Sequence, residues 1–97
     1  DDIFLVGDGL AAGERFVLGP EIARGAMGEV HAARDTRLGR DVAVKVLQAR
    51  LAGTTAERRF ADEARITGQL QHPGIPPVYD LGTLPDGRPY LAMKLID

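Results

Sequence analysis

The stretch Asp41-Val42-Ala43-Val44-Lys45-Val46-Leu47 decides the fold of this chain. It is a valine-rich apolar run with the length and composition of a buried β-strand, and it holds one lysine. An ammonium group is costly to bury unless a partner nearby requires it. Lys94 is the other lysine, and the remaining basic residues are all arginine. Lys45 is therefore a candidate functional residue.

The segments on either side of this strand have patterns of their own. Ile22-Ala23-Arg24-Gly25-Ala26-Met27-Gly28-Glu29-Val30 places a glycine turn between two loosely alternating segments, 15–22 and 29–34, which predicts an antiparallel hairpin. Strong helix formers fill residues 56–70 after Thr54 or Thr55, either of which can cap a helix. Residues 78–84 and 88–96 predict a second hairpin around the turn Leu84-Pro85-Asp86-Gly87-Arg88.

Three strands, one helix and two strands predict an α+β domain. We expect a five-stranded antiparallel sheet with one main helix between the third and fourth strands. A dinucleotide-binding fold would need a helix directly after the glycine turn, whereas Glu29-Val30-His31-Ala32-Ala33 has the character of a strand. We interpret residues 1–14 as a leader with at most one short strand, and residues 15–97 as the domain.

Composition excludes several classes of function. A net charge of −2 gives no basic surface for nucleic acid. The chain has no cysteine, and His31 and His72 lie far apart in sequence, so we expect no metal ligands here. The apolar run Ile3-Phe4-Leu5-Val6 is far shorter than the ~20 residues of a membrane span, so we expect no membrane contact from this segment. These features are compatible with a cytoplasmic location, although a longer parent protein could be anchored to a membrane through a segment outside this one.

The stretches quoted above, together with Phe60-Ala61-Asp62-Glu63-Ala64 and His72-Pro73-Gly74-Ile75, resemble the protein kinase family. They are most similar to the N-terminal lobe of bacterial serine/threonine kinases of eukaryotic type, from about Arg15 to Ile96. The resemblance implies that the chain stops at the hinge. It also implies that the C-terminal lobe, with the catalytic loop and metal ligands, is absent, so that the fragment alone is inactive.

The resemblance implies ATP as the cofactor. It also implies that the absent lobe holds Mg²⁺ and binds the protein substrate. Lys45 would reach the α- and β-phosphates, and Glu63 would hold its ammonium group. Ala23 stands where the family has its first glycine. Met93 would lie at the back of the pocket. The implied nucleotide contacts are Ile22, Ala23, Arg24, Gly25, Ala26, Met27, Gly28, Val30, Ala43, Lys45, Met93, Lys94 and Ile96.

Each feature also has an ordinary structural explanation. The glycines could form a plain hairpin turn, Lys45 could extend from a strand end to water, and Glu63 could pair with Arg59 on its own helix. Two other functions therefore stay open: a pseudokinase or regulatory nucleotide-binding module without phosphotransfer, and an unrelated small α+β interaction domain. We expect the isolated lobe to self-associate, because Ile22, Val30, Ala43, Met93 and Ile96 would face water.

Overall fold

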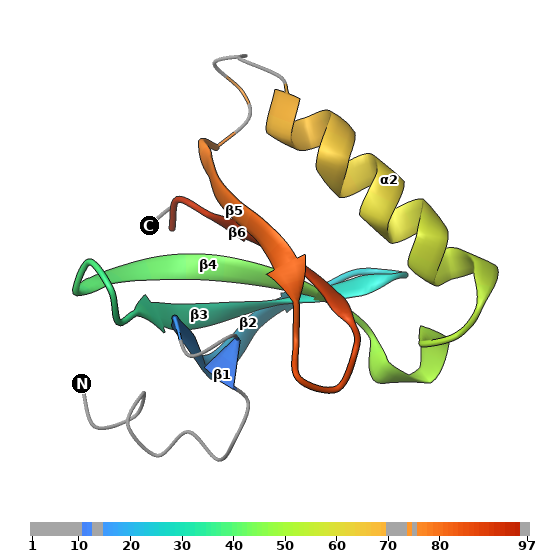
Figure 1. Ribbon diagram of the computed structural model, residues 1–97, viewed down its shortest axis with the longest axis horizontal. Coiled ribbons are helices and arrows are strands. Elements are labelled where there is room, and N and C mark those ends of the chain that lie inside the picture. Colours follow the sequence, from blue (N-terminus) through green and yellow to red (C-terminus); the bar gives the residue numbers. More distant parts are fainter. Residues whose placement is uncertain (1–10, 13–14, 70–73, 75, 96–97) are drawn as a thin grey trace.

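The computed structural model describes residues 11–12, 15–69, 74 and 76–95. Six antiparallel strands form one sheet in the order β1-β2-β3-β4-β6-β5, and one α-helix packs beside it (Figure 1). The elements are β1 (Ala11–Ala12), β2 (Phe16–Arg24), β3 (Gly28–Asp35), β4 (Arg40–Leu47), the 3₁₀ turn η1 (Ala49–Leu51), α2 (Thr55–Gln69), β5 (Val78–Thr83) and β6 (Pro89–Met93).

The predicted α+β fold is confirmed. The five expected strands and the helix between the third and fourth of them form in the expected order, and β1 is a two-residue strand within the expected leader. Thr54 caps α2, because its Oγ1 accepts a hydrogen bond from the amide of Ala56 at 3.2 Å. The carboxylate of Glu57 accepts from the amide of Gly53 at 3.0 Å, so two amides near this helix end are bonded.

Strand β4 separates two environments by the alternation of its side chains. Val42, Val44 and Val46 are buried in a core cluster with residues of β2, β3 and β6, including Phe16 and Tyr90. The rings of Phe16 and Tyr90 meet edge to face, with centroids 5.8 Å apart. Lys45 points to the opposite face and is half-buried. The sheet thus buries its valines and presents its lysine on the other side.

Two turns of the sheet contain a glycine with a positive φ. Gly39 ends the turn between β3 and β4 with φ 67°, and Gly87 lies between β5 and β6 with φ 95°. Both values lie in the left-handed region that favours glycine. None of the helices in the described part of the chain is both long and apolar enough to cross a membrane.

Candidate functional site

The glycine turn connects β2 to β3 and covers a groove. The loop closes through a hydrogen bond from the amide of Gly25 to the carbonyl of Gly28 at 2.8 Å. A groove of about 420 Å³ lies against it, and its walls are residues 23–28, Val30 and Lys45. The residues from Ala23 to Gly28, in and beside the glycine turn, therefore lie in one place, together with the predicted lysine.

Lys45 is shared by this groove and a second, smaller pocket. The second pocket, of about 60 Å³, is lined by Lys45, Phe60, Glu63, Ala64, Thr67 and Leu91. Strand β4 supplies the lysine, α2 supplies Glu63, and Val30 of β3 lies directly opposite Lys45 in the sheet register. The structure thus brings the predicted lysine between the glycine turn and the predicted glutamate.

Lys45 and Glu63 line the same pocket without forming an ion pair in the structure. Among the described residues, the ion pair on α2 joins Arg65 to Asp62, and Arg59, the alternative partner of Glu63, does not bind it either. The Lys45 ammonium lies 5.9 Å from the centre of the Phe60 ring. A half-buried cation without a carboxylate partner in the described chain is suited to an added anion.

Gly28 has a packing role that the motif alone does not reveal. A Cβ at this position would lie 3.1 Å from the carbonyl oxygen of Val46 and 3.3 Å from both Lys45 Cε and the Phe60 ring. A Cβ at Gly25 would meet nothing closer than 4.0 Å. The two glycines of the turn therefore serve different purposes: Gly28 lets β3 lie close over the lysine and α2, and Gly25 belongs to the open loop.

The remaining predicted contacts are dispersed. Ala43 is buried, and it pairs with Met93 of β6 in the sheet. The amide of Lys94 donates to the carbonyl of Pro77 at 3.0 Å. The backbone group of Lys94 that stays available for the predicted contact with adenine is therefore its carbonyl. Ile22 is 53% exposed and does not line the groove. Ile96 lies outside the described residues. Ala23 belongs to β2, opposite Val30, rather than to the turn itself.

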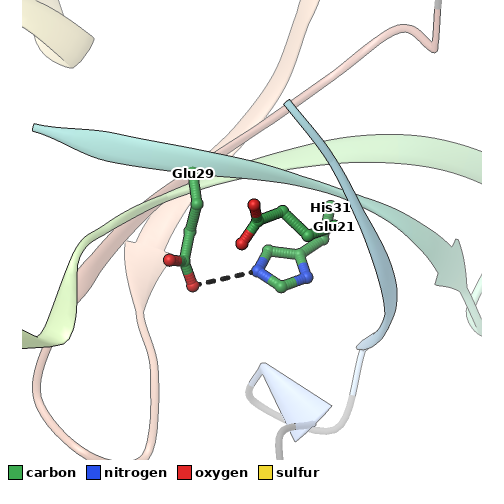
Figure 2. Close-up of side chains that lie close together, drawn as sticks. All are labelled: Glu21, Glu29 and His31. Atoms are coloured by element: carbon green, nitrogen blue, oxygen red, sulfur yellow. Dashed lines mark hydrogen bonds and ion pairs between the residues drawn. The ribbon is translucent and has the colours of Figure 1, made fainter. Parts of the chain in front are cut away.

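A charged network that sequence reasoning missed lies in the part of the same hairpin nearer the turn. Figure 2 shows Glu21 of β2 beside Glu29 and His31 of β3, with His31 Nε2 3.1 Å from Glu29 Oε1. The other ring nitrogen of His31 donates to the carbonyl of Gly19 at 3.0 Å. That carbonyl lies at a register shift in β2, where the ladder between the strands is interrupted. The network therefore joins β2 to β3 where the register of backbone pairing shifts.

Glu21, Glu29 and His31 are also a set of groups that could bind a divalent cation, since their ligand atoms lie within 4.8 Å of one another. Arg24, however, already binds both carboxylates, at 2.7 Å from Glu21 and 3.0 Å from Glu29. Hydrogen bonds from Arg24 are the main reason why the pKa of Glu21 is lowered. Arg24 thus supplies the positive charge that these acids require, and we assign the network to holding the hairpin together.

Comparisons with known proteins agree with the geometry. The chain is 46% identical to the probable serine/threonine-protein kinase SCO3848 of Streptomyces coelicolor, over 88% of this chain. It is 48% identical to the serine/threonine-protein kinase PknB of Mycobacterium tuberculosis, over 87% of this chain. It spans only 13% and 14% of the lengths of these two relatives. No protein-family model matches the chain.

Solved structures give the same result for the fold. The kinase domain of Mycobacterium tuberculosis PknI matches 86% of this chain with a TM-score of 0.64 and 31% identity, and the match covers 34% of that domain. PpkA-294 matches 84% of this chain with a TM-score of 0.67 at 24% identity, which bears on the fold alone. The chain therefore has the fold of a kinase N-terminal lobe and corresponds to part of bacterial serine/threonine kinases.

Proposed function

We propose that this chain is the ATP-binding lobe of a serine/threonine-protein kinase and aligns the phosphates of ATP for transfer to a protein hydroxyl. The observation that carries the proposal is the place of Lys45, between the glycine turn on one side and Glu63 on the other. The similarity to bacterial serine/threonine kinases over most of this chain supports it.

The chain's own groups divide the task between them. The amides of the glycine turn donate to phosphate oxygens, and Lys45 contributes a positive charge beside them. In the proposed nucleotide complex Glu63 pairs with Lys45, which requires a shift within the small pocket that both residues line. Adenine would lie against Val30 and Ala43, with Met93 behind it and the carbonyl of Lys94 at its edge. The proposal places the lobe in the cytoplasm, where ATP is the phosphate donor.

Mg²⁺ accompanies ATP in kinases and neutralises charge on the phosphates. The ion prefers oxygen ligands in octahedral geometry, usually carboxylates and water. None of the residues that line the groove carries a carboxylate. The residues that line the groove therefore do not fit a protein-held Mg²⁺. Its ligands, like the binding surface for a protein substrate, would come from residues outside this lobe.

The test is nucleotide binding and phosphoryl transfer by the full-length protein, with Lys45→Met as the variant. We expect kcat to fall by on the order of 10² or more, because the lysine acts most strongly on the charge of the transition state. ATP affinity should fall less. Arg58→Met is the matched control, since it also replaces a cation by methionine and Arg58 lies exposed on α2.

Each outcome separates the candidate functions. A Lys45→Met protein with kcat within about threefold of wild type would contradict the proposed role of the lysine. ATP binding without any transfer would favour the pseudokinase alternative, for which Ala23, in place of the family's first glycine, is the specific observation. Indifference to ATP would favour an unrelated interaction domain.

A further inference from the structure

Three successive carbonyl groups of the glycine turn are bound by one short segment that follows β4. The side-chain amide of Gln48 donates to the carbonyl of Gly25 at 2.6 Å, and the guanidinium of Arg50 donates to that of Ala26 at 3.1 Å. The backbone amide of Gln48 donates to the carbonyl of Met27 at 2.8 Å. The carbonyls of residues 25, 26 and 27 at the tip of the turn are therefore each hydrogen-bonded to this segment.

The two side chains that hold the turn also support each other. Arg50 Nε donates to the side-chain oxygen of Gln48 at 3.0 Å, which fixes the orientation of the amide group that donates to Gly25. Gln48 is only 6% exposed, and its carbonyl accepts a hydrogen bond from the amide of Leu51 as η1 begins. The pair, hereafter the Gln48–Arg50 clamp, is therefore anchored to regular structure.

The direction of the bound carbonyls determines the direction of the amides. In a trans peptide the C=O and the following N–H point in opposite directions. Carbonyls of residues 25–27 that face the clamp therefore turn the amides of residues 26–28 away from it. Neither clamp residue lines the groove, whereas the whole turn and Lys45 do. Within the described chain, the amides of Ala26 and Met27 donate no hydrogen bond.

We propose that Gln48 and Arg50 are positioning residues that hold the glycine turn with its amides directed into the groove, toward the phosphate chain of a bound nucleotide. Successive backbone amides that converge on one side form a favourable site for an anion, and the Lys45 ammonium adds charge to it. The clamp acts through the backbone and does not touch the nucleotide. This inference rests on the proposed function. It adds that the Gln48–Arg50 clamp sets the orientation of the turn's amides and so the affinity of the turn for phosphate.

The inference predicts that the clamp matters for phosphates and not for the rest of the nucleotide. In the full-length protein, Gln48→Glu keeps the shape of the side chain and a partner for Arg50, but it cannot donate to Gly25. Gln48→Leu removes both bonds without adding charge. We expect each change to weaken ATP binding by about fivefold to tenfold, the range for one lost hydrogen bond. Adenosine, which has no phosphate, should bind as it does to wild type.

Calorimetric titration of each variant with ATP and with adenosine measures the two affinities that the inference compares. Gln69→Glu, at the exposed end of α2, is the matched control. Equal losses for both ligands would show a merely structural role and would overturn the inference, as would unchanged ATP affinity. If thermal melts show that the Gln48 variants do not fold, Arg50→Met gives the same test at an exposed position. Arg50→Lys, which retains a hydrogen-bond donor, should then recover part of the lost ATP affinity.

The proposed function and the clamp fail in different ways. A wild-type protein that does not bind ATP would overturn both. ATP binding that is weakened by Lys45→Met but is indifferent to all the clamp variants would overturn the clamp alone. Loss of the ATP preference in the clamp variants, with adenosine binding intact, is the result that the inference requires.

Discussion

At the scale of single residues, neighbouring positions with the same side chain have different roles. Gly25 and Gly28 belong to one turn, and the sequence motif treats them alike. In the structure Gly28 lies against a backbone oxygen, the lysine stem and a buried phenylalanine ring, whereas Gly25 faces open space. Only Gly28 is required by packing, and neither residue has the positive φ that would by itself require glycine.

This difference predicts responses of different size to the same substitution. Gly28→Ala should lower the free energy of unfolding by about 1–3 kcal/mol, because the Val46 carbonyl belongs to a buried strand and cannot move aside. It should also displace Lys45. Gly25→Ala should change stability by no more than about 0.5 kcal/mol. Urea unfolding of the two variants measures both values, and similar losses at both positions would contradict the packing role of Gly28.

At the scale of elements, the turn between β3 and β4 is organised by one buried acid. Asp35 is fully buried, and its carboxylate accepts two hydrogen bonds from Arg15, both at 3.2 Å, and others from the amides of Arg37 and Leu38. Arg40 lies 3.5 Å away and stacks on the Tyr79 ring of β5. The turn is thus tied to Arg15, directly before β2, on one side and to β5 on the other.

Asp35 predicts how stability depends on pH. Burial alone would raise its pKa, but the hydrogen bonds from Arg15, Leu38 and Arg37 and the charge of Arg15 outweigh burial, so the pKa is lowered. The unfolded chain, with an ordinary carboxyl pKa of ~3.9, then binds a proton more readily than the folded chain. The stabilisation from this group is present above about pH 4 and is lost as pH falls through the lower folded-state value.

Asp35→Asn should therefore lower stability by about 1–3 kcal/mol near neutral pH, because Arg15 loses the carboxylate to which it donates two hydrogen bonds. The difference from wild type should shrink below about pH 4, where the native acid is protonated as well. Thermal melts between pH 3 and pH 7 measure this difference. Asp62→Asn, in an exposed pair on α2, is the control and should show little change. A difference independent of pH would contradict the role of the charge.

At the scale of the whole molecule, the exposed apolar surface is smaller than the sequence predicts. Ala43 was expected to face water, but it is 5% exposed because β4 lies between β3 and β6, whose residues flank it in the sheet. Val30 and Met93 are half-buried. The large exposed apolar side chains among the described residues are Ile22, Leu38, Ile66 and Leu81, which come from different elements.

We still expect the 97-residue chain to self-associate at high concentration, because Ile22, the neighbour of the groove-lining Ala23, is an apolar side chain that is 53% exposed. Ile22→Thr should shift the association to higher concentration. Leu38→Thr, at a position on the β3–β4 turn that is 58% exposed, should not. Sedimentation velocity across a concentration series measures the effect. A chain that stays monomeric throughout, or equal effects of the two changes, would show that the groove side is not the contact.

Much of the fold was predictable from the sequence because it depends on near neighbours along the chain. Valines at alternate positions of β4 specify a buried face, and Lys45 must then lie on the other. Thr54 caps the helix, and Gly39 and Gly87 take the turn conformations that other residues disfavour. The sterics and hydrogen bonds that set these features act within a few residues.

The site depended on contacts between distant segments. Lys45 and Glu63 could be proposed as partners from the resemblance, but only the structure shows that they share a pocket and are not bonded there. The one available signal for the clamp was a polar Gln48 two residues after the core residue Val46. Nothing in the local sequence indicates that it binds a carbonyl 23 positions earlier. Such contacts arise when strand pairing brings remote segments together, so the sequence determined the elements, and tertiary packing decided which groups meet.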